Sequence, residues 1–126
     1  EAIVVEVLAT EGSDDALSAP VKSVLYRVAQ EAVQNARRHA APRHIEIRLE
    51  TGSRSVILEI ADDGRGFDLA AKQREQTGIG LFTMRERVAL VDGELHVTTR
   101  PGGGTSVVAS IPLHDSSSEE PRGADT

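Results

Sequence analysis

The spacing of apolar residues changes once in the first half of the chain, and this change limits the fold. Between residues 21 and 36, apolar side chains recur every three or four positions, which is the spacing of one helix face. Ser18 is suited to cap such a helix and Pro20 to occupy its first turn, and Pro42 closes it near His39. From residue 45 onward the apolar residues alternate, which is typical of half-buried strands. The two strands are marked by Ile45, Ile47 and Leu49 and by Val56, Leu58 and Ile60.

Three further segments complete a small domain. The β-branched run at residues 3–8 predicts a first strand, Gly52-Ser53 marks a hairpin turn, and residues 94–112 predict a second hairpin around a turn at 101–104. The resulting order is strand, helix, hairpin, long connection, helix, hairpin. This order favours a two-layer α+β sandwich, with a mixed, mostly antiparallel sheet and both helices on one face.

The long connection between the two halves runs from Asp62 to Gly80 and is rich in glycine and charge. A connection of this length inside a compact domain is usually a lid or a binding loop. A second helix is expected after Gly80, with Gly93 as its C-terminal stop. The apolar side of this helix is expected to comprise Leu81, Met84, Val88, Leu90 and Val91.

Composition limits both the extent of the domain and its partners. Residues 114–126 contain four acidic residues, one arginine and no large apolar residue, so we expect a disordered acidic tail after a domain at 1–113. The tail carries −3 of the net charge of −6, and the domain has only Tyr26, Phe67 and Phe82 as aromatics. A mildly acidic surface with few aromatic rings argues against direct nucleic-acid binding.

The sequence also bears on where the domain is located. The absence of cysteine fits a cytoplasmic domain. No apolar run is long enough to span a membrane, and this is compatible with a membrane anchor elsewhere in a full-length protein.

The first cluster of functional candidates lies on the predicted first helix. Glu31, Asn35 and His39 are spaced by four and share one face, with Arg38 beside them. Carboxylate and amide oxygens suit a hydrated Mg²⁺ that is shared with phosphate groups, and the basic side chains suit the phosphates themselves. The competing interpretation is a solvated helix face.

The second cluster is Asp62-Asp63-Gly64-Arg65-Gly66, at the end of a strand. Its glycines let a flat ligand approach the backbone, and a carboxylate there can accept a hydrogen bond from an exocyclic amine such as adenine N6. The alternative is a tight turn. The third cluster, Gly78-Ile79-Gly80-Leu81, opens a helix, whose N-terminal N–H groups would bind a phosphate. The fourth, Gly102-Gly103-Gly104-Thr105, is interpreted first as a hairpin turn.

In this order and at these separations, the clusters resemble the GHKL ATPase superfamily. Residues 27–40 look like its N box, Asp62-x-Gly64-x-Gly66 like its G1 box and Gly78-x-Gly80-Leu81 like its G2 box. The segments 84–97 and 100–112 are similar to the nitrate-sensor-like class of histidine kinases, whose partners are helix-turn-helix response regulators. The resemblance covers roughly residues 1–113.

The resemblance implies a role for each matching position. Asp62 would bind adenine N6 with help from Thr105, Asn35 would coordinate Mg²⁺, and Glu31 would polarise the metal-bound water or assist proton transfer. Arg38 and His39 would approach the phosphates, and residues 67–77 would form the ATP lid. The remaining positions implied to bind ATP are Gly64, Gly66, Gly78, Gly80 and Leu81.

The implied activity is that of a histidine-kinase catalytic domain, which would phosphorylate a histidine on a separate dimerisation domain of a homodimer for onward transfer to a response regulator. None of the four histidines (His39, His44, His96 and His114) stands in the helical setting beside an acid that the family uses for its phosphoacceptor. Two alternatives stay open. A serine kinase that regulates a sigma factor would leave phosphoserine on a small partner, and a non-catalytic interaction module would fail to bind ATP.

Overall fold

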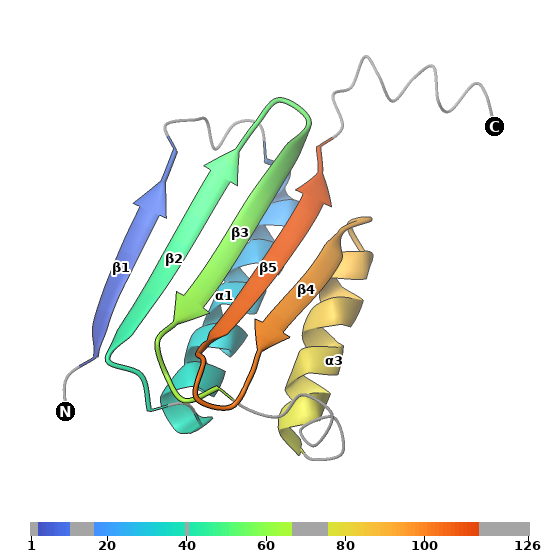
Figure 1. Ribbon diagram of the computed structural model, residues 1–126. Helices are drawn as coiled ribbons and strands as arrows, with labels where there is room; N and C mark the ends of the chain where they lie inside the picture. Colours follow the sequence, from blue (N-terminus) through green and yellow to red (C-terminus); the bar gives the residue numbers. More distant parts are fainter. Residues whose placement is uncertain (1–2, 11–16, 40, 67–75, 114–126) are drawn as a thin grey trace, which may run out of the picture.

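The computed structural model describes residues 3–10, 17–39, 41–66 and 76–113. Figure 1 shows the elements of this part of the chain. They are β1 (Val4–Ala9), α1 (Ala19–His39), β2 (His44–Thr51), β3 (Ser55–Asp62), α3 (Gln76–Ala89), β4 (Glu94–Thr99) and β5 (Thr105–Pro112). The acidic tail at 114–126 and most of the predicted lid, residues 67–75, lie outside the described residues.

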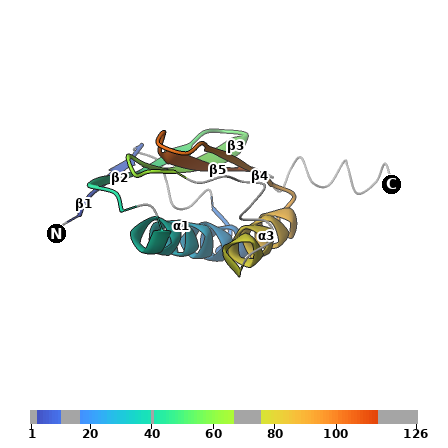
Figure 2. The same cartoon turned by 60° about the horizontal axis from the view of Figure 1, so that its bottom comes forward.

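The strands form a single mixed sheet in the order β1-β2-β3-β5-β4. The connection through α1 returns the chain in the same direction, so β1 and β2 are parallel. The β2–β3 and β4–β5 hairpins are antiparallel, and so is the β3–β5 pair that joins them. Both helices lie on the same face of this sheet (Figure 2). The predicted two-layer α+β sandwich is confirmed.

Helix α1 forms where the apolar spacing predicted it. The Ser18 hydroxyl accepts a hydrogen bond from the Val21 backbone N–H at 3.3 Å, which satisfies one donor of the first turn. Its predicted apolar stripe is buried throughout, and it packs on the inward-facing residues of the strands. The buried stripe consists of Val21, Leu25, Val28, Ala32 and Ala36.

The prediction of the apolar side of α3 is wrong at the C-terminal end of the helix. Leu81, Met84 and Val88 are buried, but Leu90 is 82% exposed. The helix ends at Ala89, and the left-handed residue that turns the chain away is Asp92, with a φ of 63°, rather than Gly93. The Gly93 N–H donates to the Val88 carbonyl at 2.9 Å, which closes the last turn in the manner of a helix cap. The Leu90 N–H still donates to the Glu86 carbonyl at 3.2 Å, so Leu90 continues the helical path. It faces solvent because it lies two residues after Val88, which is not the spacing of one helix face.

The start of α3 also differs from the prediction. The helix begins at Gln76, so Gly78 and Gly80 lie inside its first turns rather than before it, and Gln76 and Thr77 are helical rather than part of a lid. The end of β3, the end of α1 and the start of α3 all lie at the same end of the molecule (Figure 1). The fold therefore gathers the three predicted clusters at one end of the sheet.

Candidate functional site

Asp62 is the last residue of β3 and lies beside Thr105, the first residue of β5. It is half-buried, and its Oδ1 accepts a hydrogen bond from the Gly64 N–H at 2.7 Å. The backbone N–H of Thr105 is a second donor to this carboxylate. A cavity of about 200 Å³ opens next to it. The described residues that line it are Ala61, Asp62, Thr98, Thr99, Arg100, Gly103, Gly104, Thr105 and Ser106.

The environment of Asp62 raises the pKa of its carboxyl group above the usual 3.8. Partial burial is the largest cause because it disfavours the charged form, and the neighbouring charge of Asp63 adds to it. The Gly64 and Thr105 N–H groups act in the opposite direction, because they stabilise the carboxylate. A carboxylate with two backbone donors still has lone pairs for a further donor, such as the amine of a ligand.

This raised pKa predicts a pH-dependent difference in stability between the protein and its Asp62→Asn variant. Because the folded-state pKa lies above the unfolded value, protonation of Asp62 stabilises the fold fully below pH 3.8, and this contribution is lost as the pH rises through the raised pKa. We therefore expect the unfolding free energy of the unchanged protein, relative to Asp62→Asn, to fall as the pH rises across this window. Urea unfolding of both proteins at a series of pH values measures the difference, and a difference that stays constant or rises would contradict it.

Two glycine turns interlock around Asp62. Gly66 has a φ of 66°, and a Cβ there would overlap the carbonyl oxygen of Arg100. Gly104 has a φ of 77°, and a Cβ there would lie 2.5 Å from the carbonyl oxygen of Asp62. The Gly102 N–H donates to the Arg65 carbonyl, which joins the two turns directly. The turn between β4 and β5 is therefore one wall of the site, a role that the sequence did not assign to it.

Thr99 is a site residue that the sequence analysis missed. Its hydroxyl lies 2.8 Å from that of Thr105, and it also donates to the Gly104 carbonyl at 3.3 Å. Thr99 and Thr105 are paired across the β4–β5 hairpin. The available signal was the register of that hairpin, which places a second hydroxyl next to the threonine implied by the resemblance.

The α1 candidates lie apart from the Asp62 cavity. Glu31 and Asn35 are half-buried at the rim of the core, as their spacing predicted, but neither lines that cavity. Arg38 is exposed and lines a separate cavity of about 360 Å³ with Gln34 and Arg37. The side chains of His39 and of residues 76–80 lie outside the described part of the structure. The structure thus brings Asp62 and Thr105 together and places the end of α1 at the same end of the domain (Figure 1), while the described α1 candidates do not line the Asp62 cavity.

Within the described residues, no group of three or more histidine, aspartate or glutamate side chains is arranged to hold a metal ion. No helix in the same part of the chain is long and apolar enough to cross a membrane.

Comparisons with known proteins agree with this geometry. Residues 21–115 match the family described as histidine kinase-, DNA gyrase B- and HSP90-like ATPases. Two proteins named signal transduction histidine-protein kinase/phosphatase DegS are each 38% identical, one from Brevibacillus brevis over 74% of this chain and one from Bacillus subtilis over 82%. The chain spans about a quarter of their lengths, at 24% and 27%.

The fold also resembles a solved structure, the histidine kinase domain of the blue-light activated histidine kinase EL346 from Erythrobacter litoralis. The TM-score is 0.72 and the identity 27%, over 88% of this chain and 52% of that one.

Proposed function

Because the chain belongs to the family of histidine kinase-, DNA gyrase B- and HSP90-like ATPases, we propose that it is the ATP-binding catalytic domain of a sensor histidine kinase. In this proposal it donates the γ-phosphoryl group of ATP to a histidine on a separate dimerisation domain. The supporting observation is the half-buried Asp62 carboxylate, which is held by backbone donors at the mouth of a cavity. The phosphoryl group would then pass to a response regulator. The full-length protein would be a homodimer of the nitrate-sensor-like class, and this domain would lie in the cytoplasm beside any membrane anchor.

The base of ATP would be held at the end of β3. Asp62 would accept a hydrogen bond from adenine N6, and Thr105, supported by Thr99, would assist at the same edge. Gly64 would let the ring approach the backbone, while Gly66 makes room for the Arg100 carbonyl of the adjoining turn. Gly78, Gly80 and Leu81 in the first turns of α3 are the other proposed ATP-binding positions, and the free N–H groups of the first turn, which include that of Gly78, would face the phosphates. A helix N-terminus suits this task because its free N–H groups and dipole favour negative charge.

The donor set on α1 suits Mg²⁺. Glu31 and Asn35 are one helical turn apart and half-buried, and their carboxylate and amide carbonyl oxygens are hard ligands. Few protein oxygens are needed, because Mg²⁺ usually keeps several waters and shares the phosphates of its nucleotide. Asn35 would supply the ligand oxygen, and when bound, Mg²⁺ neutralises charge on the phosphates. Arg38 and His39, at the end of the same helix, would add positive charge toward them.

Transfer itself requires positioning more than covalent chemistry within this chain. The imidazole nitrogen of the incoming histidine would attack the γ-phosphorus, forming a P–N bond as the P–O bond to ADP breaks. Glu31 would accept the proton that the imidazole releases. Charge that develops on the phosphoryl oxygens is stabilised by fixed donors, which is the usual source of rate enhancement in such reactions.

We expect Asn35→Ala to remove the advantage that Mg²⁺ gives to ATP binding, because the variant lacks the amide oxygen. Adenosine, which has no phosphates, should bind as before. Calorimetry with ATP, with and without Mg²⁺, and with adenosine measures both effects. Gln30→Ala is the matched control, since it removes an exposed amide from α1 to which no contact with ATP is assigned. Equal losses for ATP and adenosine would mean that Asn35 supports the fold or faces the base.

The proposed activity is tested with γ-labelled ATP. The chain alone should not label itself, whereas adding the cognate dimerisation domain as a separate chain should label that partner with acid-labile phosphate. Because the two are untethered, labelling should rise with partner concentration. Stoichiometric label on this chain alone would contradict the proposal, and an acid-stable phosphoserine on the partner would favour a serine kinase.

A further inference from the structure

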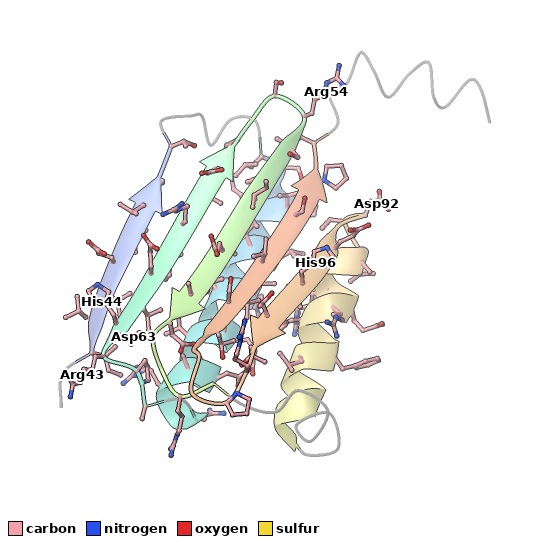
Figure 3. The ribbon with its side chains drawn as sticks, viewed as in Figure 1. Arg43, His44, Arg54, Asp63, Asp92 and His96 are labelled. Carbon is pink, nitrogen blue, oxygen red and sulfur yellow. The ribbon has the colours of Figure 1, made fainter. Side chains whose placement is uncertain are left out.

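Asp63, the neighbour of Asp62, holds two elements together at the end of the sheet. Its Oδ1 accepts hydrogen bonds from the backbone N–H groups of Arg43 and His44, each at 2.9 Å. Its own N–H donates to the His44 carbonyl at 3.3 Å. Figure 3 shows the three residues together, where β2 begins and β3 ends. One side-chain oxygen thus receives two donors, from residues 19 and 20 positions earlier in the chain.

These contacts differ from those of an ordinary turn aspartate. Aspartate in a turn usually bonds the backbone two residues further on, and Asp62 does so with Gly64. Asp63 instead bonds across the sheet. The hydrogen bonds from His44 and then Arg43 lower the pKa of its carboxyl group, because they stabilise the charged form.

Arg43 is where the connection from α1 joins the sheet. It lies four residues after His39, the last residue of α1, and its carbonyl accepts the Val4 N–H at 2.9 Å. The Asp63 carboxylate therefore fixes the segment that follows α1 to the end of β3. Asp62 and Asp63 are consecutive, so Asp62 cannot move along the sheet without breaking this attachment.

We infer that Asp63 is a positioning residue, which sets the base-binding carboxylate of Asp62 relative to the phosphate-binding end of α1. This inference rests on the proposed function, because it concerns the two halves of the same ATP site. ATP occupies both halves at once, so it requires a fixed spacing between them. Adenosine occupies only one half and is less sensitive to that spacing.

Three substitutions separate position from charge. Asp63→Ala removes the acceptor, and we expect about tenfold weaker ATP binding with a smaller effect on adenosine, since small displacements in a site of this kind are costly. Asp63→Asn keeps an oxygen at the same place without the charge and should restore ATP binding. Asp63→Glu keeps the charge but moves the oxygen by one methylene, and it should bind ATP less tightly than Asp63→Asn. Calorimetry with both ligands gives these affinities.

The controls separate a local effect from a general one. Glu86→Ala removes one exposed negative charge on α3 and should leave ATP binding unchanged. Amide hydrogen exchange in the same samples should be faster at Arg43 and His44 in Asp63→Ala, while buried amides such as that of Val28 stay protected. This exchange reports the loss of the attachment even if ATP binding is weak.

Several results would overturn the inference. They are ATP binding by Asp63→Ala that equals that of the unchanged protein, an Asp63→Asn variant as weak as Asp63→Ala, and equal losses for ATP and adenosine. Failure of the unchanged chain to bind ATP would instead refute the proposed function, and with it the premise of this inference. The two failures are therefore told apart by the unchanged protein.

Discussion

Asp62→Asn should weaken ATP binding by roughly ten- to a hundredfold while the domain stays folded. A hydrogen bond to a charged group contributes about 1.5–3 kcal/mol, and the variant replaces one carboxylate oxygen with an amide donor that faces the N6 amine. The remaining amide oxygen can keep the Gly64 hydrogen bond, so the turn should survive. Calorimetry with ATP gives the affinity, and circular dichroism checks the fold.

Glu86→Gln is the control for this substitution, because it makes the same chemical change at an exposed position on α3. It should bind ATP like the unchanged protein. A folded Asp62→Asn protein with unchanged ATP affinity would show that this carboxylate does not hold the base.

Gly104→Ala should lower the free energy of unfolding by about 2–4 kcal/mol and remove most ATP binding. Its φ of 77° is unfavourable for alanine, and the added Cβ would lie 2.5 Å from the Asp62 carbonyl oxygen, so the strand end must shift. Urea unfolding measures the loss of stability, and calorimetry measures ATP binding at a temperature where the variant is folded.

Gly102→Ala separates the cost of the left-handed backbone from the cost of the close contact with Asp62. Its φ of 79° is nearly the same, but nothing lies within 4 Å of the added Cβ. Its cost should therefore be only the left-handed strain of about 1–2 kcal/mol, with ATP binding preserved. If the two variants were equally stable and bound ATP equally well, the close approach of Gly104 to Asp62 would have no role in the site.

Periodic patterns were sufficient for much of the fold. The stripe from Val21 to Ala36 predicted both α1 and its buried face, because the core requires apolar residues at helical spacing. The same reasoning was misapplied at Leu90, which lies two residues after Val88 and six after Met84. That is not the spacing of one helix face, so Leu90 belongs to the exposed side of α3. The left-handed Asp92 that follows has no periodic signal of its own.

The site was predictable only in part, for a related reason. Asp62 stands out in the sequence because spaced glycines follow it, whereas the partners of Asp63 are backbone N–H groups about twenty residues away. Any residue type provides such donors, so the sequence does not mark them. Thr99 likewise lies next to the site only because the hairpin register pairs it with Thr105. The roles assigned to all of these site residues, on α1 and around Asp62 and Thr105 alike, stay predictions.

Backbone amide chemical shifts, recorded while ATP and Mg²⁺ are added to the ¹⁵N-labelled chain, locate the nucleotide most directly. The largest changes should fall on three segments, namely residues 62–66, residues 99–105 and the end of α1 from Glu31 to Arg38. Exposed residues on the opposite face of the sheet, such as Arg48 and His96, should change little. Changes confined to that opposite face, or no change at saturating ATP, would contradict an ATP site at the end of β3.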